Sequence, residues 1–322
     1  MPELPEVETV RVGLEKLIVG MTIKTIEHDN EKSFPNDPAI VSQFAINSDV
    51  SLVKRRAKVL LIELSTEYTL MTHLKMTGQL VFVAQRDLGS KILENREESS
   101  QRMSPRSIIQ DPLSNEVRFG AGHPNDSLVG NLPDKSTRVT ITFKDDSKLF
   151  FNDQRKFGWM KLLPTALVAQ EPFMVKLGPE PLEPEFTDKI FISRVRRRAN
   201  TSIKAAILDQ TVLAGVGNIY ADESLWGAKI HPATLVRNLS DKQLSVLRRE
   251  IIYVLKLSIE KGGSTDRNYV NAEGKRGSYI DFARVFRQEN KPCPRCQSII
   301  IKTRVAGRGT HICLICQKHK NK

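Results

Sequence analysis

The chain has no hydrophobic run long enough to cross a membrane and no recognisable export signal. Nowhere in its 322 residues is there a run of about 18 apolar residues, the least that a membrane-spanning helix needs. The first six residues, from Met1 to Glu6, are acidic where a secretory signal begins with a basic segment followed by an apolar one. These absences predict a cytoplasmic protein that has no membrane partner.

Aromatic residues are also few, at 6% of the chain, and the chain has only four cysteines. Hydrophobic residues nevertheless make up 40% and charged residues 27%, which is enough apolar material to bury a core and excludes global disorder, collagen and coiled coils. Since a domain takes roughly 100–200 residues, the length predicts two domains with a small third module.

Acidic residues are scarce in the last two-fifths of the chain. Residues 190–322 contain 25 Lys and Arg against 10 Asp and Glu, whereas residues 1–189 contain 24 against 27. The whole formal charge of +12 therefore arises from the C-terminal part. Such an asymmetry favours a polyanionic partner, nucleic acid first, over a basic surface kept for solubility.

The four cysteines, Cys293, Cys296, Cys313 and Cys316, have the spacing C-x2-C-x16-C-x2-C. Two such pairs supply the four thiolates of a closed tetrahedral zinc site, so we expect one structural Zn²⁺ rather than two disulfides. With four thiols present, we expect His311 and His319 to be surface residues. The residues between the pairs predict a strand over 298–305 and a turn over 306–309, which places Arg308 at the tip of a hairpin.

Hydrophobic periodicity divides the rest of the chain into a β-rich part and a helical part. Helical spacing over 7–19 comes first, and residues 84–134 predict a long polar loop with no periodicity. A segment rich in Pro and Glu, 178–185, predicts an interdomain linker. Strands are expected at 22–26, 50–53, 59–64, 68–73, 78–83, 138–143, 148–152 and 159–163. Helices are expected at 190–198, 202–208, 219–226 and 241–261, the last capped by Ser240 or Asp241 and ended by Gly262 and Gly263.

Pro2 follows the initiator methionine, and removal of Met1 exposes a secondary amine. Terminal amines have pKa values of about 8, so a neutral fraction exists near pH 7. Attack of this amine on an aldehyde-level carbon gives an iminium ion, which drives elimination at the neighbouring carbon. Glu3 stands next to it as a general acid, with Glu6 nearby. Taken alone, this start is common by chance.

Taken together, five motifs and the cysteine hairpin resemble bacterial formamidopyrimidine-DNA glycosylase, an oxidised-purine repair enzyme. The motifs stand in order along the chain, and only residues 84–134 fall outside the resemblance. They are MPELPEVET at 1–9, RRAK at 55–58, HLKMTG at 73–78, DQRKFG at 153–158 and GVGNIY at 215–220.

The resemblance implies an α+β multidomain fold: an N-terminal β-sandwich with flanking helices, a helix–two-turn–helix domain and a zinc-finger β-hairpin. The boundaries expected are 1–178, 186–283 and 284–318. It implies a bifunctional DNA glycosylase and abasic-site lyase of base excision repair, which takes 8-oxoguanine and formamidopyrimidines from duplex DNA through a Schiff base and cleaves the strand by β,δ-elimination. We expect a monomer that acts at the bacterial nucleoid.

The resemblance also implies roles for single residues. Pro2 matches the nucleophile, Glu3 the acid that assists sugar ring opening, Lys58 the lysine of β-elimination and Arg308 the arginine of δ-elimination. The gap left by the everted nucleotide is filled by residues that match Met76, Arg155 and Phe157, of which Arg155 contacts the orphaned cytosine and Phe157 wedges between bases. Lys204 and Asn218 match residues that contact the phosphates of the DNA backbone. Glu223 matches a glutamate of the helical domain that lies close to the active site.

Three departures from the family pattern leave questions open. Ser136 stands where the family often has the first histidine of a His-x-His pair, so that this histidine's bond to DNA is either missing or taken over by Arg138. The loop that covers the everted base has Gly277-Ser278-Tyr279, which leaves lesion preference open, and residues 84–134 add an insertion of about 40 residues for which a disordered surface loop is the default. The alternatives are the sister branch that removes oxidised pyrimidines and a non-catalytic zinc-finger DNA-binding protein.

Overall fold

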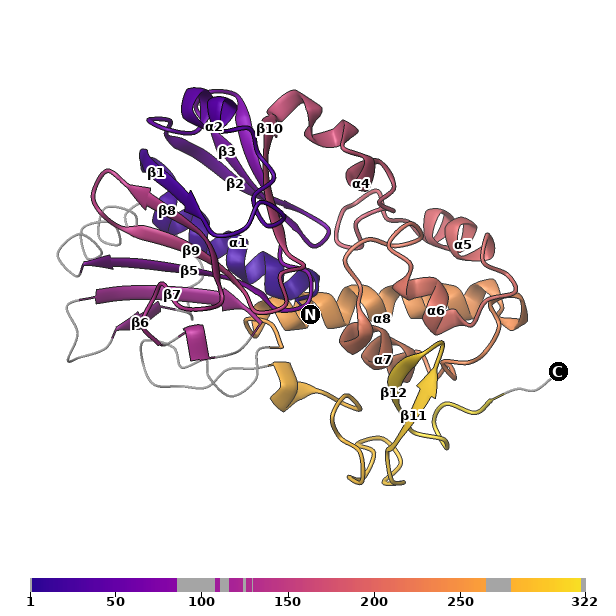
Figure 1. The fold of residues 1–322 in the computed structure, drawn as a ribbon. Helices are drawn as coiled ribbons and strands as arrows, with labels where there is room; N and C mark the ends of the chain where they lie inside the picture. Colours follow the sequence, from indigo (N-terminus) through magenta and orange to yellow (C-terminus); the bar gives the residue numbers. More distant parts are fainter. Residues whose placement is uncertain are drawn as a thin grey trace. The chain divides into compact units, whose positions relative to one another are not determined.

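The chain forms two compact units, each described here by itself. The computed structural model describes residues 2–85, 108–110, 116–123, 126–128, 130–264 and 279–319. The first unit is Met1–Glu171 with Gly262–Ser278, and the second is Pro172–Lys261 with Tyr279–Lys322 (Figure 1). Among the helices that the structure describes, none is both long and apolar enough to cross a membrane.

Two antiparallel sheets build the first unit. The six-stranded sheet has the order β1-β8-β9-β5-β7-β6 and the four-stranded sheet the order β10-β4-β3-β2. The strands of the first sheet are β1 (Ile23–His28), β5 (Gly78–Gln85), β6 (Ile108–Gln110), β7 (Glu116–Gly122), β8 (Thr137–Phe143) and β9 (Lys148–Asp153). Those of the second are β2 (Val50–Arg56), β3 (Val59–Leu64), β4 (Tyr68–His73) and β10 (Trp159–Pro164).

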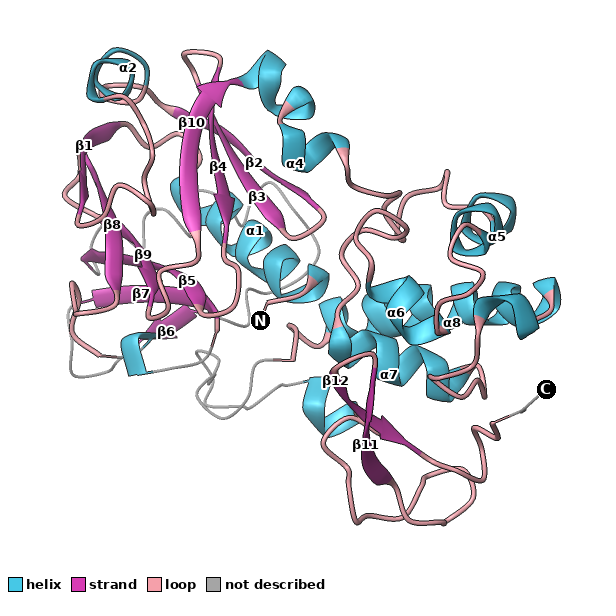
Figure 2. Cartoon of the chain, turned by 45° about the vertical axis from the view of Figure 1, so that its right-hand side comes forward, coloured by secondary structure: helices cyan, strands magenta, loops and turns pink. Residues whose placement is uncertain are grey.

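Helix α1 (Leu4–Ile18) supplies one face of the core that the two sheets share (Figure 2). Its apolar residues at positions 7, 10, 14 and 17 are buried, which confirms the predicted helix. Gly13 lies on the same helix against β7, where a Cβ atom would come within 2.0 Å of the Phe119 ring. The absence of a side chain at Gly13 therefore lets this aromatic ring reach the helix backbone. A short helix that the sequence did not predict, α2 (Pro38–Phe44), begins after the capping residue Asp37.

The segment 84–134 is not one continuous loop, and the prediction was wrong there. Strand β7 lies inside it and pairs with β5 along its whole length, from Gln79 opposite Gly122 to Gln85 opposite Glu116. Phe119 of this strand is fully buried. The glycines at 120 and 122, which fall inside the predicted loop, lie in the strand, and a Cβ on Gly122 would approach the Gly78 carbonyl to 2.5 Å.

The second unit consists of helices followed by a small two-stranded sheet. The predicted helices are confirmed to within two residues at each end, and Ser240 rather than Asp241 caps the longest, with Gly262 at φ +77° after its end. The helices are α4 (Pro172–Val175), α5 (Asp188–Arg196), α6 (Ile203–Leu208), α7 (Asn218–Gly227) and α8 (Asp241–Glu260). Short 3₁₀ turns are Asp126–Leu128 and Thr165–Gln170 in the first unit, and Val236–Asn238 and Tyr279–Phe282 in the second.

The segment predicted as a linker, 178–185, packs within the second unit. The Gly178 N–H donates to the Gln210 carbonyl (2.7 Å), and the Ala214 N–H donates to the Pro179 carbonyl (3.0 Å). A Cβ on Gly178 would meet Val212 at 2.8 Å. The chain passes from one unit to the other earlier, between Glu171 and Pro172.

The chain ends in a hairpin of β11 (Ile301–Val305) and β12 (Arg308–Ile312) beside the cysteines. Ala306 and Gly307 form its two-residue turn, both with positive φ, so Arg308 is the first residue of a strand rather than the tip of a loop. The expected mixed fold, with an N-terminal sheet domain, a helical domain and a zinc-finger hairpin, is confirmed.

Candidate functional site

The N-terminal segment is held at the start of α1. Pro2 is buried, and Glu3, which precedes the first helical residue, is 3% exposed. One carboxylate oxygen of Glu6 accepts from the Glu3 N–H (2.8 Å), and the other accepts from the Ser264 N–H (2.7 Å) and hydroxyl (2.8 Å). Glu6 therefore fixes the segment that carries Pro2 and Glu3 by joining the Glu3 backbone to Ser264.

Lys58 lies in the tight turn between β2 and β3, next to His73. Ala57 forms the turn at φ +54°, and its carbonyl accepts from the Arg55 guanidinium (3.0 Å). Val59, which follows Lys58, pairs with His73 at the end of β4. Burial, with the positive charges of Lys75 and Lys58, lowers the pKa of His73 to about 3. His73 is therefore neutral near pH 7, and its Nδ1 accepts from the Lys75 N–H (2.9 Å).

The three side chains predicted to fill the gap in DNA lie together in the structure. Met76 is 40% exposed and Phe157 53%, although both are large and apolar. The Arg155 guanidinium contacts both, with Nη1 3.3 Å from the Met76 sulfur and Cζ 5.0 Å from the centre of the Phe157 ring. Two loops far apart in sequence thus present one exposed cluster of two apolar groups and a cation.

Asp153, to which the sequence assigned no role, holds these two loops in place. Its carboxylate is fully buried and accepts from the Thr77 hydroxyl, next to Met76. The same carboxylate accepts from the N–H groups of Arg155 (3.2 Å), Phe157 (2.8 Å) and Gly158 (2.6 Å). Asp153 is the first residue of the DQRKFG motif. This position was a sequence signal that its carboxylate could accept hydrogen bonds from the backbone of the residues that follow.

Arg138 is not placed to replace the missing histidine. Its side chain is 2% exposed and forms an ion pair with Asp29. Its Nε donates to the carbonyls of Ser136 (2.9 Å) and Asp153 (3.1 Å). Ser136 is also buried and bonds to the Asp134 carboxylate (2.7 Å). Of the two outcomes left open, the one in which no residue takes over the histidine's bond to DNA fits this geometry.

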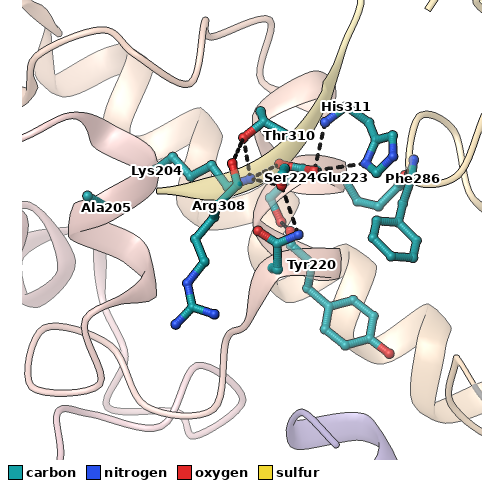
Figure 3. Close-up of polar contacts among 12 residues, drawn as sticks. Lys204, Ala205, Tyr220, Glu223, Ser224, Phe286, Arg308, Thr310 and His311 are labelled. Atoms are coloured by element: carbon teal, nitrogen blue, oxygen red, sulfur yellow. Dashed lines mark hydrogen bonds and ion pairs between the residues drawn. The ribbon is translucent and has the colours of Figure 1, made fainter. Parts of the chain in front are cut away.

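Lys204 forms the centre of a buried polar group in the second unit (Figure 3). It has no exposed surface, and its Nζ lies 2.6 Å from Asp222 Oδ1. The same Nζ donates to the Thr310 hydroxyl (2.8 Å) and the Gly309 carbonyl (3.0 Å). Three acceptors take up the three protons of the ammonium. This burial is contrary to the prediction that Lys204 contacts a phosphate directly.

Asn218 binds the same strand of the hairpin. It begins α7, and its Nδ2 donates to the Gly309 carbonyl (3.0 Å), which Lys204 also binds. The preceding residue, Arg308, is exposed, and its side chain points away from the buried group in Figure 3. Lys204 and Asn218 thus hold the backbone next to the arginine that the family resemblance assigns to δ-elimination.

His311 is buried, so the prediction that it is a surface residue was wrong. It is 4% exposed, its N–H donates to Asp222 Oδ2 (2.9 Å), and its Nδ1 lies 3.3 Å from the same oxygen. His311 of β12 faces Asp222 of α7, a contact between two elements that the local sequence does not show. His319, by contrast, is exposed as predicted.

Glu223 anchors the segment that leads to the hairpin. Its side chain is fully buried, and one oxygen accepts from the N–H groups of Val285 (2.9 Å) and Phe286 (2.8 Å). The other accepts from the Arg284 N–H (2.9 Å) and the Tyr279 hydroxyl (3.2 Å). Burial, followed by the Glu223 charge, raises the pKa of Tyr279. Of the predicted lesion loop, Gly277 and Ser278 lie outside the described residues.

The four cysteines converge on one point, as the spacing predicted. Their sulfur atoms all lie within 4.8 Å of one another, and all four are free thiols. Cys293 also accepts a hydrogen bond from the indole N–H of Trp226 (3.4 Å), and this ring packs beneath the cysteines. Four sulfur donors at this spacing fit a closed tetrahedral zinc site. The chain therefore has one structural zinc site, docked on α7 through Trp226.

Comparison with family models matches three segments of the chain. The formamidopyrimidine-DNA glycosylase N-terminal domain matches residues 1–160, and the H2TH domain of the same enzyme matches residues 177–269. A zinc finger found in FPG and IleRS matches residues 290–318.

Curated relatives match over the full length. The formamidopyrimidine-DNA glycosylase of Ligilactobacillus salivarius is 37% identical over 321 residues, which cover 100% of both chains. That of Pelotomaculum thermopropionicum is 36% identical over 322 residues, or 99% of this chain and 100% of the relative.

Solved structures agree. A mutant Lactococcus lactis FPG in complex with Fapy-dG containing DNA superposes with a TM-score of 0.78 at 31% identity, covering 99% of this chain and 100% of the other. The Lactococcus lactis Fpg bound to abasic-site DNA gives 0.77 at 32% identity, with 98% and 100% covered.

Proposed function

The chain belongs to the formamidopyrimidine-DNA glycosylase family, and we propose that its substrates are oxidised purines in duplex DNA, among them formamidopyrimidines and 8-oxoguanine. It is a DNA glycosylase of base excision repair. Solved relatives bind DNA that carries Fapy-dG or an abasic site. The observation that carries the proposal is the exposed cluster of Met76, Arg155 and Phe157, because an enzyme that everts a base must fill the gap it leaves.

In the proposed reaction, Pro2 is the nucleophile once Met1 is removed. Its amine nitrogen bonds to C1′ of the damaged nucleotide as the bond from C1′ to the base breaks, and the proton lost from the nitrogen balances the one that the departing base takes up. Glu3, acting as an acid, then gives its proton to the ring oxygen as the sugar opens, and the nitrogen lone pair forms the iminium ion. The contacts that Glu6 makes to Glu3 and Ser264 support this role, since they fix the segment carrying both reacting groups.

Strand cleavage follows from the iminium ion. Loss of a proton from C2′ expels the 3′ phosphate, and Lys58 is assigned to this proton transfer. Loss of a second proton, from C4′, then expels the 5′ phosphate, and Arg308 is assigned to this step. Since the pKa of His73 is about 3, the imidazole beside Lys58 adds no positive charge near pH 7. The exposed side chain of Arg308 and the buried contacts of its strand support a preset position for the second step.

In the gap, we assign the Arg155 guanidinium to the edge of the orphaned base and Phe157 to the wedge between bases, with Met76 beside them. Asn218 remains the proposed phosphate contact of the second unit. Lys204 and Glu223, both fully buried, act by holding the hairpin and the segment before it.

We propose a division of labour along the chain that follows the predicted boundaries. Residues 1–178 carry Pro2, Glu3 and Lys58, residues 186–283 the helix–two-turn–helix contacts to DNA, and residues 284–318 the zinc finger with Arg308. The protein then acts as a monomer on the bacterial chromosome in the nucleoid.

Borohydride trapping tests the nucleophile and the substrate together. Reduction of the iminium ion should link the native protein covalently to a duplex with 8-oxoguanine opposite cytosine. A Pro2→Gly variant, or a protein that retains Met1, should lose this adduct. Equal trapping by these variants rules out Pro2, and stronger trapping on duplexes with an oxidised pyrimidine assigns the chain to the sister branch.

A further inference from the structure

A hollow in the second unit is lined mainly by basic side chains. It has a volume of about 360 Å³ and lies where the C-terminal end of α5 meets the loop after α6 and the residue after α4 (elements labelled in Figure 1). Its lining residues are Lys176, Arg194, Arg197, Arg198, Thr211 and Val212. Four of these side chains are cationic near pH 7.

Only one of these four charges is balanced by a carboxylate. Arg198 forms an ion pair with Asp209 at 2.6 Å. Arg194 donates to the carbonyl of Thr211 (3.1 Å), which is a neutral acceptor. Across the part of the chain that the structure describes, no carboxylate forms an ion pair with Lys176, Arg194 or Arg197. Four cations against one carboxylate leave a surplus of three positive charges.

The end of a helix accounts for only part of this surplus. A helix C-terminus carries roughly half a negative charge, and cations in the last turn are stabilised by it. In α5, Arg194 lies in that last turn, but Lys176 lies outside the helix, and Arg197 and Arg198 follow its last residue. The remaining cations repel one another in the folded state. A bound anion would remove that repulsion.

The walls of the hollow are fixed before any anion arrives. The Asp209 carboxylate accepts from the Thr211 N–H (2.9 Å) and hydroxyl (2.7 Å) as well as from Arg198. Burial alone would raise the pKa of Asp209, but these bonds outweigh it and hold the pKa below its ordinary value. The carboxylate therefore stays ionised near pH 7, and the loop and two of the arginines keep their positions.

We propose that this hollow is a phosphate-binding site. Planar guanidinium groups bind phosphate oxygens through paired donors, and three of the four cations are arginines. The site lies beyond the C-terminal end of α6, whereas Lys204, near the N-terminal end of the same helix, binds the hairpin. It is thus separate from the group around Arg308. A phosphodiester of the DNA backbone and a free pyrophosphate offer the same chemistry, and the site does not depend on the lesion chemistry proposed above.

The test removes two charges from the hollow in the full-length, zinc-loaded protein. The variant is Lys176→Ala/Arg197→Ala, at two exposed positions. The matched control is Lys242→Ala/Arg249→Ala, which removes the same residue types from exposed positions on α8. One arm measures binding of an undamaged duplex against salt concentration. The other titrates pyrophosphate without DNA by calorimetry.

If the source is the DNA backbone, the slope of log K against log salt should fall by about 0.9 for each phosphate that the protein no longer neutralises, in the variant and not in the control. If the source is a free anion, the variant should lose pyrophosphate binding that the native protein and the control retain, with the salt slope unchanged. A variant that matches the control in both arms overturns the site. Neither arm uses damaged DNA, so the result can be interpreted even if the proposed excision chemistry is wrong.

Discussion

The ammonium of Lys204 lies 2.6 Å from the carboxylate of Asp222, and neither side chain has any exposed surface. The pair joins α6 to α7, and each partner also binds β12: Lys204 at Gly309 and Thr310, and Asp222 at His311. A buried ion pair of this kind is stable only while both charges are present, because removing one partner leaves an uncompensated charge in the interior, which strongly destabilises the fold. The pair therefore ties the placement of Arg308 to the packing of two helices.

Replacing Lys204 by Met should destabilise the second unit by about 3–5 kcal/mol, because Asp222 would be left as an unpaired buried charge. Unfolding in urea measures the change, followed by fluorescence in a Trp159→Phe background so that Trp226 is the reporting tryptophan. The double variant Lys204→Met/Asp222→Leu should recover most of the loss. A double variant as unstable as the single one would mean that packing rather than charge holds this site.

Asp153→Asn should weaken the cluster of Met76, Arg155 and Phe157, because the amide turns a donor toward N–H groups that need an acceptor. We expect a loss of about 1–3 kcal/mol in stability and at least a tenfold slower single-turnover excision. Gln154→Ala, at an exposed position in the same loop, serves as control. Native excision by Asp153→Asn would show that the loops hold their shape without this carboxylate.

Arg155→Ala should lower the preference for cytosine opposite the lesion, since a good bidentate contact to a base edge gives about 1–3 kcal/mol of discrimination. Excision rates for 8-oxoguanine opposite each of the four bases measure this preference. Lys156→Ala, the exposed neighbour, should keep it. Unchanged selectivity in Arg155→Ala would remove the residue from base reading.

The first unit should lose stability as pH falls, through His73. Its pKa is lowered from 6.5 to about 3 in the folded protein, so between these values the unfolded chain takes up a proton that the folded chain does not. The stability is therefore fully present above pH 6.5 and is lost progressively as the pH approaches 3. A His73→Asn variant should show a flatter stability curve over this range. Parallel curves for the two proteins would assign the acid loss to other groups.

Removing zinc should unfold the hairpin and abolish DNA binding while the sheet domain stays folded. In Cys313→Ser, metal content and gel-shift affinity should both be lost, with most of the circular dichroism kept. Trp226 fluorescence should change, because this ring packs against Cys293 and Arg295 lies 3.8 Å above it. Arg308→Ala should keep zinc but slow δ-elimination more than base release. Full DNA affinity without zinc would contradict the structural role of the metal.

Much of the fold could be predicted because its signals are local. The alternating strands, the apolar face of α1 and the spacing of the cysteines each depend on residues that are close in sequence. Strand β7 was missed because its glycines resemble a loop, and only pairing with β5 and burial of Phe119 make it a strand. Its partner is more than thirty residues away in sequence, beyond the reach of any local pattern.

The candidate site divides in the same way. The motifs identified Met76, Arg155 and Phe157, and the structure brings the three together. The buried partners Asp153 and Asp222 were not assigned roles, because an acidic residue in a sequence does not show which N–H groups or cations will surround it. The burial of Lys204 could not be predicted for the same reason. A lysine is expected at the surface unless a carboxylate pairs with it, and here that carboxylate comes from another helix.

Gly13 and Phe119 restrict the substitutions that are possible at each other's position. A side chain of any size at position 13 would occupy the space of the Phe119 ring, 2.0 Å from the expected Cβ. During divergence, a residue larger than glycine at 13 therefore requires the aromatic ring at 119 to move or to be replaced by something smaller. Replacement at 119 is the less costly first step, because a small residue there leaves a cavity, whereas a side chain at 13 collides with the ring. Among relatives that retain both elements, these two positions should have changed together, and an intermediate with two small residues should mark the path.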